Sequence, residues 1–111
     1  MSPPTAIMSF GQPDTTASRM GWACWLASLP LDQCAAVAIF EPWKRYRHAN
    51  TGAEVTGISR VCNDPDRGVV LDVLTRRYEN RGVTEVLGAL GCVRPSDIEE
   101  VANEKHEEAG Q

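Results

Sequence analysis

Four cysteines and two histidines are the side chains of this 111-residue chain that could hold a metal ion or act as nucleophiles. No Cys-x-x-Cys pair occurs, and neither histidine has a second ligand three or four residues away. The sequence therefore predicts no metal site and no cofactor. It also lacks a nucleophile motif and a Gly-rich phosphate loop, so we expect a protein that is not an enzyme. The residues concerned are Cys24, Cys34, Cys62, Cys92, His48 and His106.

The cysteines all lie among apolar neighbours, as in Trp22-Ala23-Cys24-Trp25 and Val61-Cys62. Free cysteine is among the most buried residue types. The first ten residues have neither the basic start nor the apolar stretch of a secretory signal, and no run is long enough for a membrane helix. We therefore expect a cytoplasmic protein with four reduced, mostly buried cysteines and no membrane contact.

Charge is the other property that could recognise a partner. The net charge is -4, which makes nucleic acid an improbable ligand. Residues 1–60 hold five basic and four acidic side chains, and residues 61–111 hold six and eleven. Charged residues that lie close together in the sequence are often only solvated surface, but as complementary patches they would bind a protein. The candidate partner-binding residues are the basic Lys44, Arg45, Arg47, Arg76, Arg77 and Arg81 and the acidic Asp64, Asp66, Glu99 and Glu100.

The segments that carry these charges have the sequence signals of helices. Trp22, Trp25, Leu26 and Leu29 recur at helical spacing before Pro30. Thr51 with Glu54 and Ser96 with Glu99 have the spacing of a capping box, and Asp64-Pro65 has that of an N-cap followed by proline at the first helical position. These signals predict helices over 15–29, 31–40, 51–62, 65–78, 82–90 and 96–102. Residues 35–40 could instead form a buried strand, because a short apolar run does not reveal its period.

The fold class predicted from these signals is all-α, a compact bundle of about six short helices. The bundle is expected to span residues 15–104 as a single domain. Residues 1–14, which contain three prolines, are expected to form a flexible arm, and residues 105–111 a charged tail.

From Trp43 to Val101 the helical pattern resembles a death domain of the Toll and interleukin-1 receptor pathway. Trp43 stands where that family has the tryptophan of its second helix, and Ile58 and Val61 match an apolar pair of the third. The segments 64–74, 82–90 and 96–101 are similar to the fourth, fifth and sixth helices. Leu74 departs from the family, which usually has tryptophan there, and 44–50 lacks the expected leucine-alanine pattern.

The resemblance implies a non-enzymatic signalling module that assembles with itself or with another death-domain-like protein through the charged residues named above. Two alternatives remain open. A small, acidic, motif-free chain also suits a viral or mobile-element inhibitor that blocks a larger enzyme. Residues 83–102 could form a DNA-binding helix-turn-helix, although Glu99, Glu100 and Glu104 would then face the phosphates.

Overall fold

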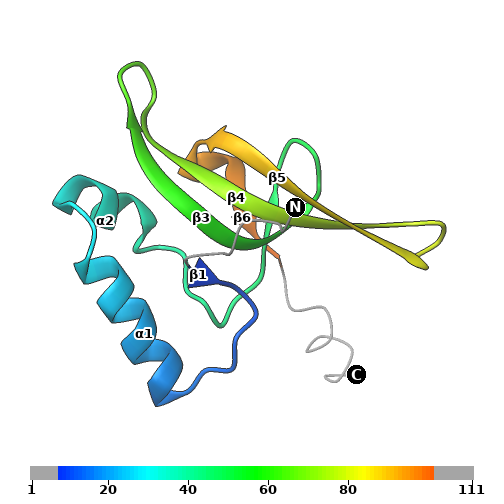
Figure 1. Cartoon of the computed structure of the whole chain (residues 1–111), viewed down its shortest axis with the longest axis horizontal. Coiled ribbons are helices and arrows are strands. Elements are labelled where there is room, and N and C mark those ends of the chain that lie inside the picture. The colour runs from blue at the N-terminus through cyan, green and yellow to red at the C-terminus, as the bar shows by residue number, and fades with distance from the viewer. Residues whose placement is uncertain (1–7, 102–111) are drawn as a thin grey trace, which may run out of the picture.

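Residues 8–101, the part of the chain that the computed structural model describes, fold around a six-stranded antiparallel sheet and not as a helical bundle (Figure 1). Two α-helices and a single 3-10 turn accompany the sheet. The helices are α1 (Thr16–Ala27) and α2 (Leu31–Val37), and the turn spans Pro95–Asp97. The strands are β1 (Met8–Ser9), β2 (Tyr46–His48), β3 (Glu54–Asp64), β4 (Gly68–Glu79), β5 (Thr84–Val93) and β6 (Ile98–Glu100).

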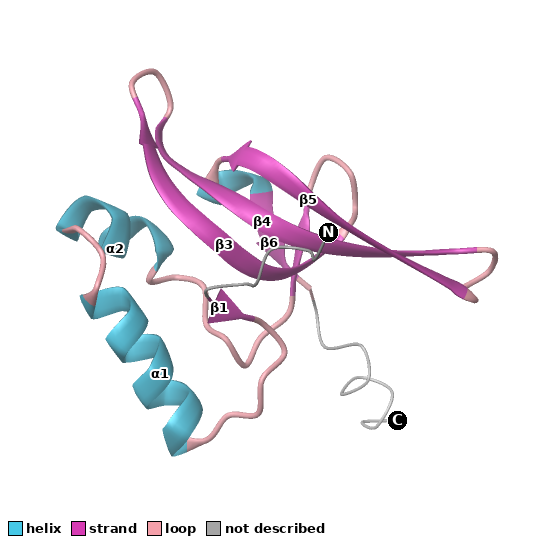
Figure 2. Cartoon of the chain, in the orientation of Figure 1, coloured by secondary structure: helices cyan, strands magenta, loops and turns pink. Residues whose placement is uncertain are grey.

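The strand order is β5-β4-β3-β2-β6, and β1 lies beside β2 against the same edge of β3. The long strands β3, β4 and β5 form a meander, and β6 then crosses back to pair with β2. Figure 2 shows both helices near the β3 end of the sheet, while the β4–β5 hairpin projects away from them. The sheet therefore has one covered region and one long uncovered extension.

The all-α prediction, and with it the death-domain and helix-turn-helix readings, is wrong because the residues from 54 to 93 pair as strands. In the segment 65–78, predicted as a helix, Val70, Val73 and Leu74 have helical spacing, but a second periodicity is also present. Leu71, Val73 and Thr75 are 0%, 0% and 8% exposed, an alternation with the period of a strand. Strand pairing uses the β-branched residues of this segment at their preferred conformation.

The predicted helix starts are turns of the sheet. The Asp64 carboxylate accepts hydrogen bonds from the backbone of Asp66 and Arg67, at 2.8 and 3.0 Å, in a hairpin loop that ends on Gly68 with φ +79°. Such a side chain satisfies a loop as readily as a helix N-terminus. Thr51 likewise caps its own turn, because its Oγ1 accepts from the Ala53 N–H at 3.3 Å. Ser96 lies in the 3-10 turn that leads into β6.

The N-terminal helices are confirmed. Thr15 caps α1 by accepting a 3.1 Å hydrogen bond from the Ser18 N–H, as expected for a helix that starts there. α2 runs to Val37, so the strand alternative for residues 35–40 is wrong. Met8 and Ser9, placed by the sequence in a flexible arm, form β1. Residues 1–7 of that arm and the tail 105–111 lie outside the described residues, and no helix of the described part is long and apolar enough to cross a membrane.

The core lies where the helices meet one face of β3 and β4. Trp25 of α1, Val37 of α2 and Phe40 after it pack with the centre of the sheet. Ile58, Leu71 and Val73 are fully enclosed there, and the Phe40 and Tyr46 rings meet edge to face at 5.3 Å. Burial of Trp25 agrees with the sequence, which placed the apolar stripe of this helix in the core.

Ile58→Ala is expected to destabilise the fold by about 2–5 kcal/mol, because it leaves a cavity among enclosed neighbours. Leu31→Ala is the matched control: this side chain is 86% exposed, so a change within about 0.5 kcal/mol is expected. Urea unfolding measures both, and equal losses for the two variants would contradict this location of the core.

Candidate functional site

Lys44 and Arg47, two of the predicted partner-binding residues, form ion pairs within the chain. Lys44 lies 3.1 Å from Glu41 and 3.5 Å from Glu100, and Arg47 lies 3.2 Å from Glu99. Arg47 and Glu99 are direct cross-strand partners in the β2–β6 ladder. Arg47 and Glu99, proposed from the sequence to bind a partner, thus lie opposite each other in one sheet.

Glu54 binds one arginine from each of two basic segments, 44–47 and 76–77. Its carboxylate is 3.0 Å from Arg45 and 3.0 Å from Arg76, which in turn lies 3.7 Å from Glu85 on β5. Partial burial raises the pKa of Glu54, but hydrogen bonds from both arginines and their positive charges outweigh this and hold the pKa below its ordinary value. The cluster therefore acts as an ionic clasp across β3, β4 and the loop before β2.

The remaining predicted residues lie at the two tips of β4. Asp64 and Asp66 belong to the β3–β4 loop at one tip. Arg77 is near the other, where its only ion pair among the described residues is with Glu79 at 3.7 Å. Arg81 stands in the β4–β5 turn with φ +58° and has no ion pair with a described residue. The structure does not gather the ten charges into one surface.

The cysteines are less buried than the sequence predicts. All four are unpaired, Cys24 and Cys92 are exposed, and Cys34 and Cys62 are half-buried. Their apolar neighbours misled the prediction because Cys24 lies on the outer side of α1, and Cys92 stands at a bulge of β5 with φ +54°. Within residues 8–101 no group of three or more His, Cys, Asp or Glu side chains is placed to hold a metal ion.

The feature that the sequence analysis missed is the outer edge of β5. One side of this ten-residue strand pairs with β4, and no described strand pairs with the other side. Residues 86–93 carry no charge, and Glu85 is the single charged residue of the strand. The signal was present in the run Val-Leu-Gly-Ala-Leu-Gly-Cys-Val, whose two internal glycines disfavour a helix.

The two edges of the sheet differ in kind. β6, at the far edge, has three residues, and two of them are Glu99 and Glu100. Short charged strands are a common protection against pairing with other chains. β5 is long, uncharged over most of its length and exposed, with Leu87 64% accessible to solvent. Within residues 8–101, β5 is the longer of these two outer strands, and its unpaired side offers a row of backbone donors and acceptors.

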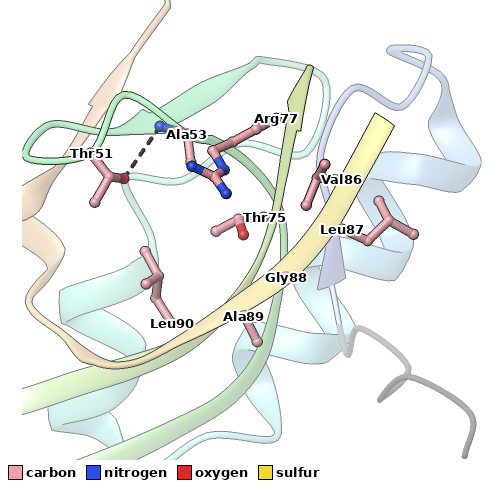
Figure 3. Close-up of a pocket in the computed structure, with 9 residues that line it drawn as sticks. All are labelled: Thr51, Ala53, Thr75, Arg77, Val86, Leu87, Gly88, Ala89 and Leu90. Atoms are coloured by element: carbon pink, nitrogen blue, oxygen red, sulfur yellow. Dashed lines mark hydrogen bonds between the residues drawn. The ribbon is translucent and has the colours of Figure 1, made fainter. Parts of the chain in front are cut away.

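A shallow hollow of about 270 Å³ accompanies the open edge (Figure 3). Thr51 and Ala53 form its far wall, Thr75 and Arg77 of β4 its floor, and five successive residues of β5 its near side. The Arg77 guanidinium reaches toward the space between Thr75 and Ala53. We call this space the β5 hollow; it is lined by Thr51, Ala53, Thr75, Arg77, Val86, Leu87, Gly88, Ala89 and Leu90.

Two properties make the hollow and the edge one site. Because Val86, Leu87, Gly88, Ala89 and Leu90 are consecutive, the hollow follows β5 lengthwise. Gly88 deepens it at the centre, since a Cβ there would lie 3.2 Å from the Thr75 Oγ1. Backbone groups along the edge can bind a strand, and the apolar lining can hold alternate side chains of that strand.

No family model, curated protein or solved structure matches this chain. The sheet excludes the death-domain assembly, which requires helices across 54–93, and the helix-turn-helix at 83–102, where the chain forms β5 and β6. The inhibitor alternative was based on small size, acidity and the lack of motifs, and neither the fold nor the comparisons support it.

Glu54→Gln tests the ionic clasp through its pH dependence. The folded pKa of Glu54 is lowered, so its contribution to stability is complete above the ordinary glutamate pKa and is lost as pH falls through the folded value. The variant is therefore expected to lose about 1 kcal/mol at about pH 7 and almost nothing at about pH 3.

Urea unfolding at both pH values provides the measurement. Glu79→Gln serves as the control, because the Glu79–Arg77 pair is 3.7 Å long and more than half exposed on both sides. An equal loss of unfolding free energy at both pH values for Glu54→Gln would contradict this, because it would show that the carboxylate charge does not stabilise the clasp.

Proposed function

We propose that this chain is a non-enzymatic binding module that takes up an extended polypeptide segment by strand addition at the open edge of β5. The observation that carries the proposal is the long uncharged edge, which no described strand covers. An incoming strand would extend the sheet by continuing the ladder of β4 and β5. This surface differs from the charged residues proposed from the sequence.

The shape of the protein supports such binding. The β4–β5 hairpin projects beyond the region covered by α1 and α2, so a second chain can approach its edge without meeting them (Figure 1). Tyr78, Val83 and Leu87 near its tip are 55%, 83% and 64% exposed. Apolar side chains left in water around an open strand are typical of an interaction surface.

The β5 hollow would supply selectivity. Its apolar residues suit small or branched side chains at alternate positions of the bound strand. Arg77, whose only described ion pair is long and exposed, would place a positive charge beside one end of that strand. An acidic residue in the partner segment is therefore favoured near Arg77.

The test is selection of short peptides from a display library on immobilised full-length protein at low surface density. Selected peptides are expected to slow amide hydrogen exchange at residues 86–91, because their backbones would cover the edge. Leu87→Lys is expected to weaken their binding about tenfold or more, since it places a charge in the apolar part of the edge.

Leu31→Lys is the matched control, because Leu31 is an equally apolar and still more exposed residue on α2. It should leave peptide binding unchanged. Peptides that bind with unaltered affinity to Leu87→Lys, or that slow exchange at α1 and α2 in place of β5, would overturn the proposal.

A further inference from the structure

The sequence of β5 is complementary to itself about Ala89. Residues 87–91 read Leu-Gly-Ala-Leu-Gly, so each leucine is matched by a glycine at the same distance on the other side of the centre. Two antiparallel copies of the strand, centred on Ala89, would place Leu87 opposite Gly91, Leu90 opposite Gly88, and alanine opposite alanine. From this pattern and the open edge we infer that the strand bound at β5 is β5 of a second copy of this chain.

Antiparallel pairing restricts the possible centres. Opposite residues of an antiparallel pair point to the same face of the sheet. In a symmetric pair of identical strands, the residue at the two-fold axis must therefore lie opposite its own copy. A centre at Gly88 would put Val86 against Leu90 and leave two glycines together. A centre at Leu87 would put Glu85 opposite Ala89. Only Ala89 sets every leucine against a glycine and keeps the charges out of the central five pairs.

The space at Gly88 is suited to a side chain from outside. A Cβ on Gly88 itself would come within 3.2 Å of the Thr75 Oγ1, so its own strand cannot fill this position without a shift. Leu90 of a second copy would lie directly opposite Gly88, over the β5 hollow that Thr75 and Gly88 line. The two-fold axis repeats the contact, so each copy both inserts a leucine and receives one.

Charge allows the same arrangement. Glu85 is the one charged residue of β5, and in this register it lies outside the five central pairs, four residues from the axis and far from its own copy. Like charges directly opposite would oppose pairing, and none face each other here. Glu85 is also partly neutralised within its own chain by Arg76 at 3.7 Å.

This inference rests on the proposed function, because it names the partner strand for the same edge. The resulting dimer would have one continuous sheet running through both copies, with the two β5 strands at its centre. The helices of each copy would lie far from the axis, since they cover the opposite end of the sheet (Figure 1).

Sedimentation equilibrium of the full chain over a wide concentration range provides the test. Wild type is expected to show a monomer–dimer equilibrium. Ala89→Lys and Ala89→Glu should each raise the dimer dissociation constant about tenfold or more, which equals about 1.4 kcal/mol, because each places like charges opposite one another at the axis. An equimolar mixture of the two variants should restore dimers, because the opposed charges then differ in sign.

Leu31→Lys is the control and should dimerise as wild type does. Ala89 is exposed, so its variants are expected to keep the wild-type circular dichroism spectrum. If the Ala89 variants lose the wild-type spectrum, Leu87→Lys replaces them in the test and should also weaken the dimer. A wild type that stays monomeric, a dimer insensitive to these variants, or a mixture that does not associate would overturn the inference.

The outcomes separate this inference from the proposed function. A monomeric wild type that still binds displayed peptides at residues 86–91 would refute self-pairing and leave strand addition standing. A monomer that binds no peptide at β5 would refute both. A dimer whose mixture of Ala89 variants associates would support both, and would identify the register directly.

Discussion

Burial of one face of the β3–β4 hairpin is the constraint on which the rest of the structure depends. Ile58, Leu71 and Val73 lose all contact with water only because Trp25, Val37 and Phe40 from the N-terminal half cover them. An isolated hairpin is marginally stable in water, so the helices and the loop after α2 complete the fold. This cover includes the indole nitrogens of Trp22 and Trp25, which are buried and have no hydrogen-bond partner among the described residues. An unsatisfied buried donor costs about 1–3 kcal/mol, so α1 is held by apolar contact against that cost.

The small amount of covering material explains why β5 is open. α1 and α2 together provide two short helices, and they lie over the sheet near β3. On the other side of β3, β2 and β6 extend the sheet with two three-residue strands, of which β6 ends in Glu99 and Glu100. Beyond Thr75, β4 and β5 leave the core together, and their side chains meet solvent on both faces. The site thus arises where the core ends, and its openness follows from how far the hairpin extends.

The basic residues near β2 form ion pairs within the fold. Lys44, Arg45 and Arg47 pair with acidic residues of the same sheet, and Glu54 ties Arg45 to Arg76. These pairs align strands that are far apart in the chain, because β6 returns to β2 only after the whole meander. Such pairs are individually weak at the surface, so each contributes at most about 1 kcal/mol to stability. The recognition surface is, by contrast, nearly uncharged.

The sequence by itself determined the parts of the fold that local chemistry specifies. α1 begins after Thr15 and ends at Ala27, two residues before the predicted end, and Trp25 is in the core, because caps and apolar stripes act over a few residues. It did not determine the fate of 54–93, where the same carboxylates and hydroxyls cap turns or helices equally well. There the β-branched residues favoured strands and the glycines at 57, 88 and 91 disfavoured a helix, and only pairing between distant segments decided the outcome. The open edge is a tertiary property as well: no local pattern shows which strand has one neighbour and which has two, because that depends on where β2 and β6 attach.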